Sequence, residues 1–169
     1  LKSGRKSPYF FNAAKMLNGG YLYDLAKCYQ AAIKDANISF DCIYGPAYKG
    51  IFLGSIVSMI LSENGSKYPL SFNRKEIKDH GEGGTIIGKN PSGDVLIIDD
   101  VISAGTAAKE SIETIKDLGA NPKVMLVGLD RQEKGKRDIS ARQELETMFE
   151  VQVISIINLD TLIAFSEDN

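Results

Sequence analysis

Two hydrophobic periods alternate along the chain, and the changes between them predict where helices and strands lie. Apolar residues recur at three- and four-residue steps over 21–36, the pattern of an amphipathic helix. The short apolar run 40–44 ends at Gly45-Pro46 and predicts a strand. The same criteria predict further helices at 50–62, 106–118, about 140–149 and about 160–165, and further strands at 69–73, 94–99, 123–129 and 151–157.

The predicted strand 94–99, Asp-Val-Leu-Ile-Ile-Asp, is the most hydrophobic of the set. A nearly continuous apolar run is typical of a parallel strand that helices cover on both faces. Strand and helix alternate at least four times without a repeat or a linker. The pattern therefore predicts a single α/β domain over 1–169, with a mostly parallel central sheet flanked by helices on both faces.

The segment 74–84 has no apolar period. It holds three basic residues, three acidic residues, one histidine and three glycines. This composition predicts a mobile charged loop. Taken alone, such a stretch is most often a solvated loop without a function of its own.

Candidate chemistry follows the central strand, because ligands of such sheets bind beyond the carboxyl ends of the strands. Asp99 and Asp100 end the predicted strand, and the segment 101–107, with small residues from Ser103 onward, leads directly into a helix. Small residues let the backbone approach a ligand, and the amides that open a helix favour an anion, so this turn predicts a phosphate site. Two carboxylates suit sugar hydroxyls or a divalent metal. The alternative is that one aspartate only caps the helix before an ordinary turn. This is disfavoured, because two unpaired carboxylates beside the core would cost free energy of folding.

Composition excludes several classes of protein. With 43% hydrophobic and 25% charged residues the chain is not of a disordered class, and a net charge of −2 argues against a main role in binding nucleic acid or an anionic membrane. No apolar run approaches the roughly 18 residues of a membrane span. Cys28 and Cys42 lack metal-ligand spacing and are expected to be buried free thiols in a reducing cytoplasm.

Rival nucleotide and metal motifs fail at defined positions. The glycines at 45 and 50 have the spacing of a P-loop, but Ile51 and Phe52 stand where Lys and Ser or Thr are required, and no GxGxxG occurs. His80-Gly-Glu82 lacks the PCxxC that completes a zinc deaminase motif.

The acidic pair with its Ser103-Ala-Gly-Thr106 turn resembles the motif by which type I phosphoribosyltransferases bind 5-phosphoribosyl-1-pyrophosphate (PRPP). Four further segments resemble the orotate phosphoribosyltransferases, in order and spacing: 1–11, 40–50, 72–84 and 129–133. The Lys78-Asp-His-Gly-Glu-Gly83 and Lys2-Ser-Gly-Arg5 stretches are the specific ones. The resemblance runs from Leu1 to about Phe165 and implies the type I phosphoribosyltransferase fold, with the terminal helices of the family outside 1–169.

The resemblance implies a cytoplasmic glycosyltransferase that moves ribose 5-phosphate from PRPP to orotate in the Mg²⁺-dependent synthesis of orotidine 5′-monophosphate and pyrophosphate, on the route to UMP. It also implies a homodimer in which the loop 74–84 is shared between subunits, with no nucleic acid and no membrane as partner. The magnesium has either no direct protein ligand or reaches Asp99 and Asp100 through water. A purine salvage transferase and a PRPP-sensing regulator are the competing functions; Arg131 and the segment opening at Lys2 argue against the first, and Lys78 and His80 against the second.

The resemblance also assigns residues to each substrate. Catalytic roles fall to Lys78, His80, Asp99 and Asp100, and we expect substitution of Lys78 to be the most damaging. PRPP contacts are expected from Lys2, Tyr48, Lys49, Arg74, Lys75, Lys78, His80, Asp99, Asp100, Val101, Ile102, Ser103, Ala104, Gly105, Thr106 and Ala107. Orotate contacts are expected from Phe10, Phe11, Ser103 and Arg131. From sequence alone, Lys49 is equally a solvated lysine at a helix start, Arg131 a partner of Glu133 in a surface ion pair, and the two phenylalanines core residues.

Overall fold

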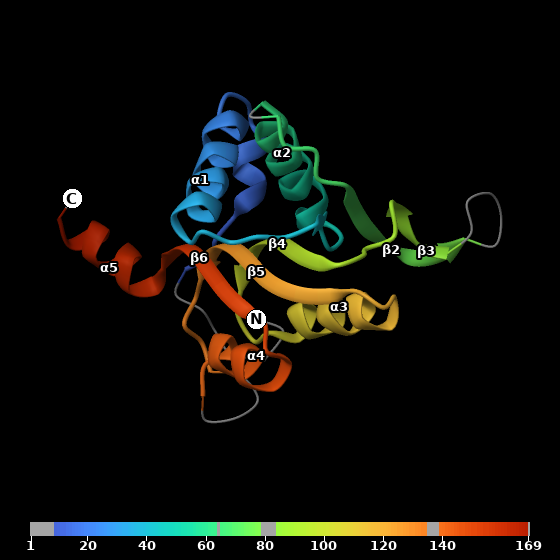
Figure 1. Cartoon of the computed structure of the whole chain (residues 1–169). Coiled ribbons are helices and arrows are strands. Elements are labelled where there is room, and N and C mark those ends of the chain that lie inside the picture. The colour runs from blue at the N-terminus through green and yellow to red at the C-terminus, as the bar shows by residue number, and fades with distance from the viewer. Residues whose placement is uncertain (1–8, 64, 79–83, 135–138, 169) are drawn as a thin grey trace.

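A computed structural model describes residues 9–63, 65–78, 84–134 and 139–168 (Figure 1). Their strands form one six-stranded sheet in the order β3-β2-β1-β4-β5-β6. All neighbours are parallel except β2 and β3. The strands are β1 (Cys42–Tyr44), β2 (Leu70–Lys78), β3 (Gly84–Gly88), β4 (Asp94–Ile102), β5 (Asn121–Asp130) and β6 (Gln152–Asn158). The predicted fold class, mostly parallel and with the 94–99 strand inside the sheet, is confirmed.

Helices cover both faces of this sheet. α1 (Leu22–Asp35) and α2 (Lys49–Glu63) lie on one face, and α3 (Thr106–Asp117) and α4 (Ala141–Phe149) lie on the other (Figure 1). Val95 and Ile97 of β4 belong to one core cluster, and Leu96 and Ile98 belong to the opposite one. Alternate side chains of a strand point to opposite faces, so a continuous apolar run fills both cores.

Two short helices complete the described chain. The 3₁₀ helix η1 (Ala13–Leu17) precedes α1 and has no counterpart among the predicted elements. α5 (Leu159–Glu167) leaves the end of β6 and projects from the body of the molecule (Figure 1). No helix in the described ranges is both long and apolar enough to cross a membrane.

The charged segment 74–84 differs from the expectation at both of its ends. β2 continues to Lys78 and β3 begins at Gly84, and the two strands pair in antiparallel fashion, with Lys78 opposite Gly84. A loop over the whole segment is therefore wrong. An antiparallel pair at the edge of a sheet can leave one face in solvent, so a strand can form there without a strong apolar period. Residues 79–83 lie outside the described residues.

The two cysteines have different environments. Cys42 is buried in β1, whereas Cys28 is exposed on α1, so the prediction that both thiols are buried is wrong for Cys28. Helical periodicity placed Cys28 on the helix, but it lies outside the buried stripe of α1, which is formed by Ala26, Tyr29 and Ile33.

A polar cluster joins the N-terminal ends of β4 and β5. The C-terminal end of β4, which leads into α3, lies at the opposite end of the strands. Lys123 Nζ lies 2.6 Å from Asp94 Oδ2, and Asn121 Nδ2 donates to Asp94 Oδ1 over 2.8 Å. The hydrogen bonds from Lys123 and Asn121 lower the pKa of Asp94. This cluster fastens β4 to β5.

Candidate active site

The carboxyl end of β4 and the start of α3 enclose a pocket of about 430 Å³. Ten of the predicted site residues line it together with Ala108 and Met125: Lys49, Asp99, Asp100, Val101, Ile102, Ser103, Ala104, Gly105, Thr106 and Ala107. The structure therefore brings the acidic pair, the small-residue turn and one lysine from the neighbouring α2 to a single place.

The turn into α3 has the features of an anion site. Gly105 has φ of +76°, a left-handed conformation that favours glycine, and it is the N-cap of α3. It offers no side chain to cap the helix, and the first residues of α3 line the pocket, so the positive end of the helix dipole lies at the pocket. A Cβ on Gly105 would stand 3.4 Å from Cβ of Ala141, the first residue of α4. The turn is thus backed closely by a second helix.

The acidic pair is held from behind by a buried tyrosine. Tyr29 of α1 is 1% exposed, and its hydroxyl donates to the main-chain oxygen of Asp99 over 2.8 Å. Burial raises the pKa of Tyr29, so the hydroxyl stays protonated as a donor. This bond fixes the end of β4 from the face opposite to α3.

Asp99 and Asp100 have different electrostatic environments. Asp99 Oδ1 accepts the main-chain N–H of Asp100 over 2.9 Å. Burial, together with the neighbouring carboxylate of Asp100, raises the pKa of Asp99 to about 7. Asp100 Oδ2 instead lies 2.5 Å from Nζ of Lys49. Asp100 is therefore paired with a cation, whereas burial disfavours the charged form of Asp99.

The segment between β1 and α2 is packed so closely that two glycines are required. A Cβ on Gly45 would stand 2.2 Å from the carbonyl oxygen of Gly50, and one on Gly50 would stand 2.8 Å from that of Ile98. The glycines that imitate a P-loop therefore allow close backbone contact. Beside them, the N–H of Ala47 donates to Oδ1 of Asn73 in β2 over 2.8 Å.

A second pocket of about 350 Å³ adjoins the first, and Ala107 lines both. Arg74 and Lys75 are among its lining residues. Tyr48 lines neither of these pockets; it is 70% exposed, with Lys75 Nζ 4.6 Å from the centre of its ring. These three predicted residues therefore lie beside the main pocket.

Arg131 follows β5, next to the same edge of the sheet. Its main-chain N–H donates to the carbonyl oxygen of Ile102 over 3.1 Å. Its side chain is 5% exposed, with Nε 2.7 Å from Oε1 of Glu133 and the guanidinium 4.2 Å from the centre of the Tyr9 ring. The ion pair with Glu133 considered from sequence is present, but it is buried, so a surface ion pair is the wrong description.

The two phenylalanines differ. Phe10 is 75% exposed, which rules out the core-packing alternative for this residue. Phe11 is half-buried, and its ring lies 3.7 Å from the place where a Cβ on Gly128 would stand. Lys2 and His80 lie outside the described residues, and Lys78 is described only by its backbone, in β2.

Four residues beside the site were not predicted: Tyr9, Tyr29, Asn73 and Glu133. Tyr29 gave only the signal of a core residue in a helix, and Glu133 appeared only as an alternative partner of Arg131. Asn73 and Tyr9 lie inside segments that resemble the family, but nothing in their residue types pointed to a loop contact or a stacking contact.

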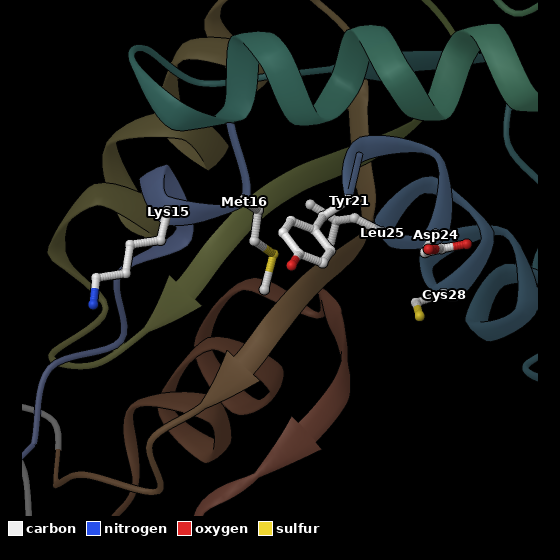
Figure 2. A pocket seen from close by; sticks show the side chains of 6 residues that line it. All are labelled: Lys15, Met16, Tyr21, Asp24, Leu25 and Cys28. Carbon is white, nitrogen blue, oxygen red and sulfur yellow. The ribbon is translucent and has the colours of Figure 1, made fainter. Parts of the chain in front are cut away.

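A further hollow of about 410 Å³ lies between η1 and the start of α1 (Figure 2). Its lining residues are Lys15, Met16, Tyr21, Asp24, Leu25 and Cys28. None of them is a predicted site residue, and the residues of the acidic pair are not among them.

Comparison with known proteins gives a consistent result. The model of the phosphoribosyl transferase domain matches residues 19–154. The chain is 52% identical over 169 residues to an orotate phosphoribosyltransferase of Marinobacter nauticus, covering all of this chain and 80% of the relative. It is 51% identical over 164 residues to one of Laribacter hongkongensis, covering 97% of this chain and 77% of the relative.

Solved structures agree. An orotate phosphoribosyltransferase of Francisella tularensis matches with a TM-score of 0.85 and 37% identity, over all of this chain and 82% of that one. The same enzyme of Mycobacterium tuberculosis, solved in complex with PRPP, shares the fold with a TM-score of 0.71 and 17% identity, over 96% of this chain and 87% of that one.

Proposed function

The chain belongs to the orotate phosphoribosyltransferases, and we propose that the pocket between β4 and α3 is where it binds PRPP. Members of this family transfer ribose 5-phosphate from PRPP to orotate, in pyrimidine biosynthesis. One observation supports this assignment above all: two carboxylates and the uncapped start of α3 line the same pocket. A phosphorylated sugar needs both a hydroxyl acceptor and an anion site.

Within this pocket the residues divide by charge. The turn 101–107 receives the 5′-phosphate, because amides at a helix start bind anions and small side chains let the backbone approach. Asp99 and Asp100 accept hydrogen bonds from the ribose 2′- and 3′-hydroxyls. Carboxylates are strong acceptors for hydroxyls and would repel a phosphate, so the reverse placement is disfavoured.

The leaving pyrophosphate needs positive charge. As the bond from ribose C1 to pyrophosphate breaks, the ribose gains oxocarbenium character and negative charge gathers on the departing oxygens. We place Lys49 and Tyr48 at the pyrophosphate, with Arg74, Lys75, Lys78, His80 and Lys2 completing the cationic surroundings. Support from the described residues is the position of Lys49 in the pocket and of Arg74 and Lys75 in the adjoining one.

Orotate is a planar anion, and N1 of its ring attacks ribose C1. Arg131 binds its carboxylate, because a guanidinium can meet a carboxylate through two parallel hydrogen bonds. Ser103, Phe10 and Phe11 contact the ring, the phenylalanines largely through backbone groups. The hydrogen bond between Arg131 N and Ile102 O supports this assignment, since it places the arginine beside the turn that holds Ser103.

The acidic pair fits a magnesium ion that is bound mainly by substrate. Among the residues that the structure describes, no three His, Cys, Asp or Glu side chains gather into a metal site. Mg²⁺ keeps several waters and takes few protein ligands when phosphates are present. The ion would either have no direct protein ligand or reach Asp99 and Asp100 through water, and it would neutralise charge on the pyrophosphate.

We also propose that 1–169 acts as one domain in a cytoplasmic homodimer in which the charged segment 74–84 reaches the site of the partner subunit, with Lys75 serving that site. Family membership supports the dimer, and free thiols fit a reducing compartment. Mixing Lys78→Ala subunits with Asp99→Asn subunits tests the sharing. Each variant alone is expected to be inactive, and partial recovery of activity on mixing is required if sites are shared.

The function itself is tested by following the loss of orotate absorbance with PRPP and Mg²⁺, with uracil and hypoxanthine as control bases. We expect turnover with orotate alone. A Lys78→Ala variant is expected to lose most of this turnover, on the order of 100-fold or more in kcat. Normal turnover by that variant would remove the loop from the catalytic account.

A further inference from the structure

The guanidinium of Arg131 is held by two side chains that the sequence did not single out as functional. Tyr9 presents the face of its ring to the guanidinium, with 4.2 Å between Cζ and the ring centre. Glu133 accepts from Nε over 2.7 Å. Both contacts lie in a closed environment, because the side chains of Arg131 and Glu133 are 5% and 15% exposed.

These two contacts restrain different motions of the same group. A planar cation stacked on an aromatic ring can still turn within its plane. A hydrogen bond at Nε opposes that turn, because Glu133 then holds one edge of the guanidinium. An arginine side chain has several rotatable bonds, so fixing both the plane and the edge lowers the entropy lost when a carboxylate binds.

The backbone beneath Glu133 is itself anchored. Its carbonyl oxygen accepts the N–H of Ala141 over 3.0 Å, at the start of α4. On the other side, the N–H of Gln132 donates to Oδ1 of Asp130 over 2.8 Å, which tightens the turn that carries Arg131. The backbone at Glu133 is therefore held by the fold through bonds that do not involve the Arg131 side chain.

We propose that Tyr9 and Glu133 are positioning residues that orient Arg131 as the receptor for the orotate carboxylate and thereby set the preference for a carboxylated base. This inference rests on the proposed contact between Arg131 and orotate. Both residues act through Arg131, and neither is a catalytic residue. When the guanidinium can turn, its hydrogen bonds to the orotate carboxylate become weaker. The loss of affinity is therefore confined to ligands that carry the carboxylate.

The test compares Glu133→Ala, Glu133→Gln, Tyr9→Leu and Tyr9→Phe with the parent enzyme. Glu133→Ala and Tyr9→Leu are expected to raise KM for orotate by roughly tenfold while KM for PRPP changes little. Glu133→Ala is also expected to lower the melting temperature, because Arg131 is left buried without its carboxylate, so the difference between the two KM values is the readout. Tyr9→Phe keeps the ring and Glu133→Gln keeps an acceptor oxygen, so each is expected to recover most of the loss. Glu146→Gln is the matched control, because Glu146 also accepts from the Nε of an arginine, Arg142, and the variant keeps an acceptor oxygen for the main-chain N–H of Val153.

A second measurement isolates the carboxylate. Binding of orotidine 5′-monophosphate is expected to weaken roughly tenfold in Glu133→Ala, whereas binding of uridine 5′-monophosphate, which lacks the carboxylate, stays unchanged. A structural defect would weaken both nucleotides alike, and that result would overturn the proposal.

Arg131→Leu distinguishes the orotate contact of Arg131 from the positioning role of Tyr9 and Glu133. If it raises KM for orotate and Glu133→Ala does not, the positioning role is wrong and the Arg131 assignment stands. If Arg131→Leu itself leaves KM for orotate unchanged, the assignment of Arg131 fails and the positioning role fails with it. In the Arg131→Leu background, Glu133→Ala is expected to cause no further rise in KM for orotate.

Discussion

Nζ of Lys49 lies 2.5 Å from Oδ2 of Asp100 and joins the start of α2 to the end of β4. The Asp100 side chain is 7% exposed and that of Lys49 is 38% exposed, so a buried carboxylate is paired with a cation that solvent can reach. The pyrophosphate contact proposed for Lys49 would therefore compete with an interaction already made in the free protein.

Replacing Lys49 by Met tests both sides of this pair. We expect kcat/KM for PRPP to fall by about 100-fold, because positive charge at the leaving group is lost. The melting temperature should also fall, because Asp100 is left buried without its cation. Steady-state kinetics and thermal unfolding check the two effects, and a variant with normal PRPP kinetics would contradict the placement of pyrophosphate at Lys49.

Asp99→Asn is expected to exchange activity for stability. The pKa of Asp99 rises from 3.8 to about 7 on folding. The folded state thus holds this proton more tightly than the unfolded state, and the parent loses stability as the pH rises through that interval. In buffer with a metal chelator, the variant should melt on the order of 5 °C above the parent at about pH 8, and by a smaller margin at about pH 5.

The same variant should lose most of its activity, because the hydroxyl acceptor has lost its charge. A melting advantage that does not grow with pH would show that Asp99 titrates near its ordinary value. Glu146→Gln serves as the control, since its carboxylate is 33% exposed on α4, away from the pocket.

Asn73 is expected to act through the loop that carries Tyr48 and Lys49. Its Oδ1 holds the N–H of Ala47. Asn73→Leu removes the acceptor and should raise KM for PRPP by about tenfold, with a smaller effect on KM for orotate. Asn73→Asp keeps an acceptor oxygen and should recover most of the loss, whereas equal damage from both variants would indicate a packing role only.

Asp94 supplies a pH dependence of the opposite sign. Hydrogen bonds from Lys123 and Asn121 lower its pKa, so the carboxylate stabilises the fold above its ordinary pKa and this contribution is lost as the pH falls through the lowered value. Asp94→Asn should therefore lower the urea midpoint at about pH 7, with the difference shrinking on acidification. A difference that is independent of pH would exclude the charge as its cause.

Much of the site could be predicted from sequence because its residues are contiguous. Asp99, Asp100 and 101–107 are consecutive, so hydrophobic pattern and residue type placed them together. The predicted strand ended at Asp99, whereas β4 continues to Ile102, so the turn into α3 is shorter than expected. Lys49 was harder, since its position in the pocket depends on how α2 packs against β4. Strand boundaries failed at 74–84, where edge strands form in a polar sequence.

The environment of the Arg131 side chain could not be predicted from its neighbours in sequence. Its neighbour Glu133 was visible in sequence, and a surface pair was the ordinary expectation. Tyr9, which is distant along the chain, lies over the guanidinium in the folded structure, and nothing local in the sequence indicates that contact. The hydrogen bond from Tyr29 to Asp99 has the same character, because a core tyrosine gives no signal of what its hydroxyl will contact.

The most direct test is a crystal structure of the protein with PRPP and Mg²⁺. The 5′-phosphate should lie on the amides that open α3, with the ribose hydroxyls within hydrogen-bond distance of Asp99 and Asp100. Density for PRPP at another surface, with the pocket between β4 and α3 left to solvent, would contradict the site on which the whole account depends.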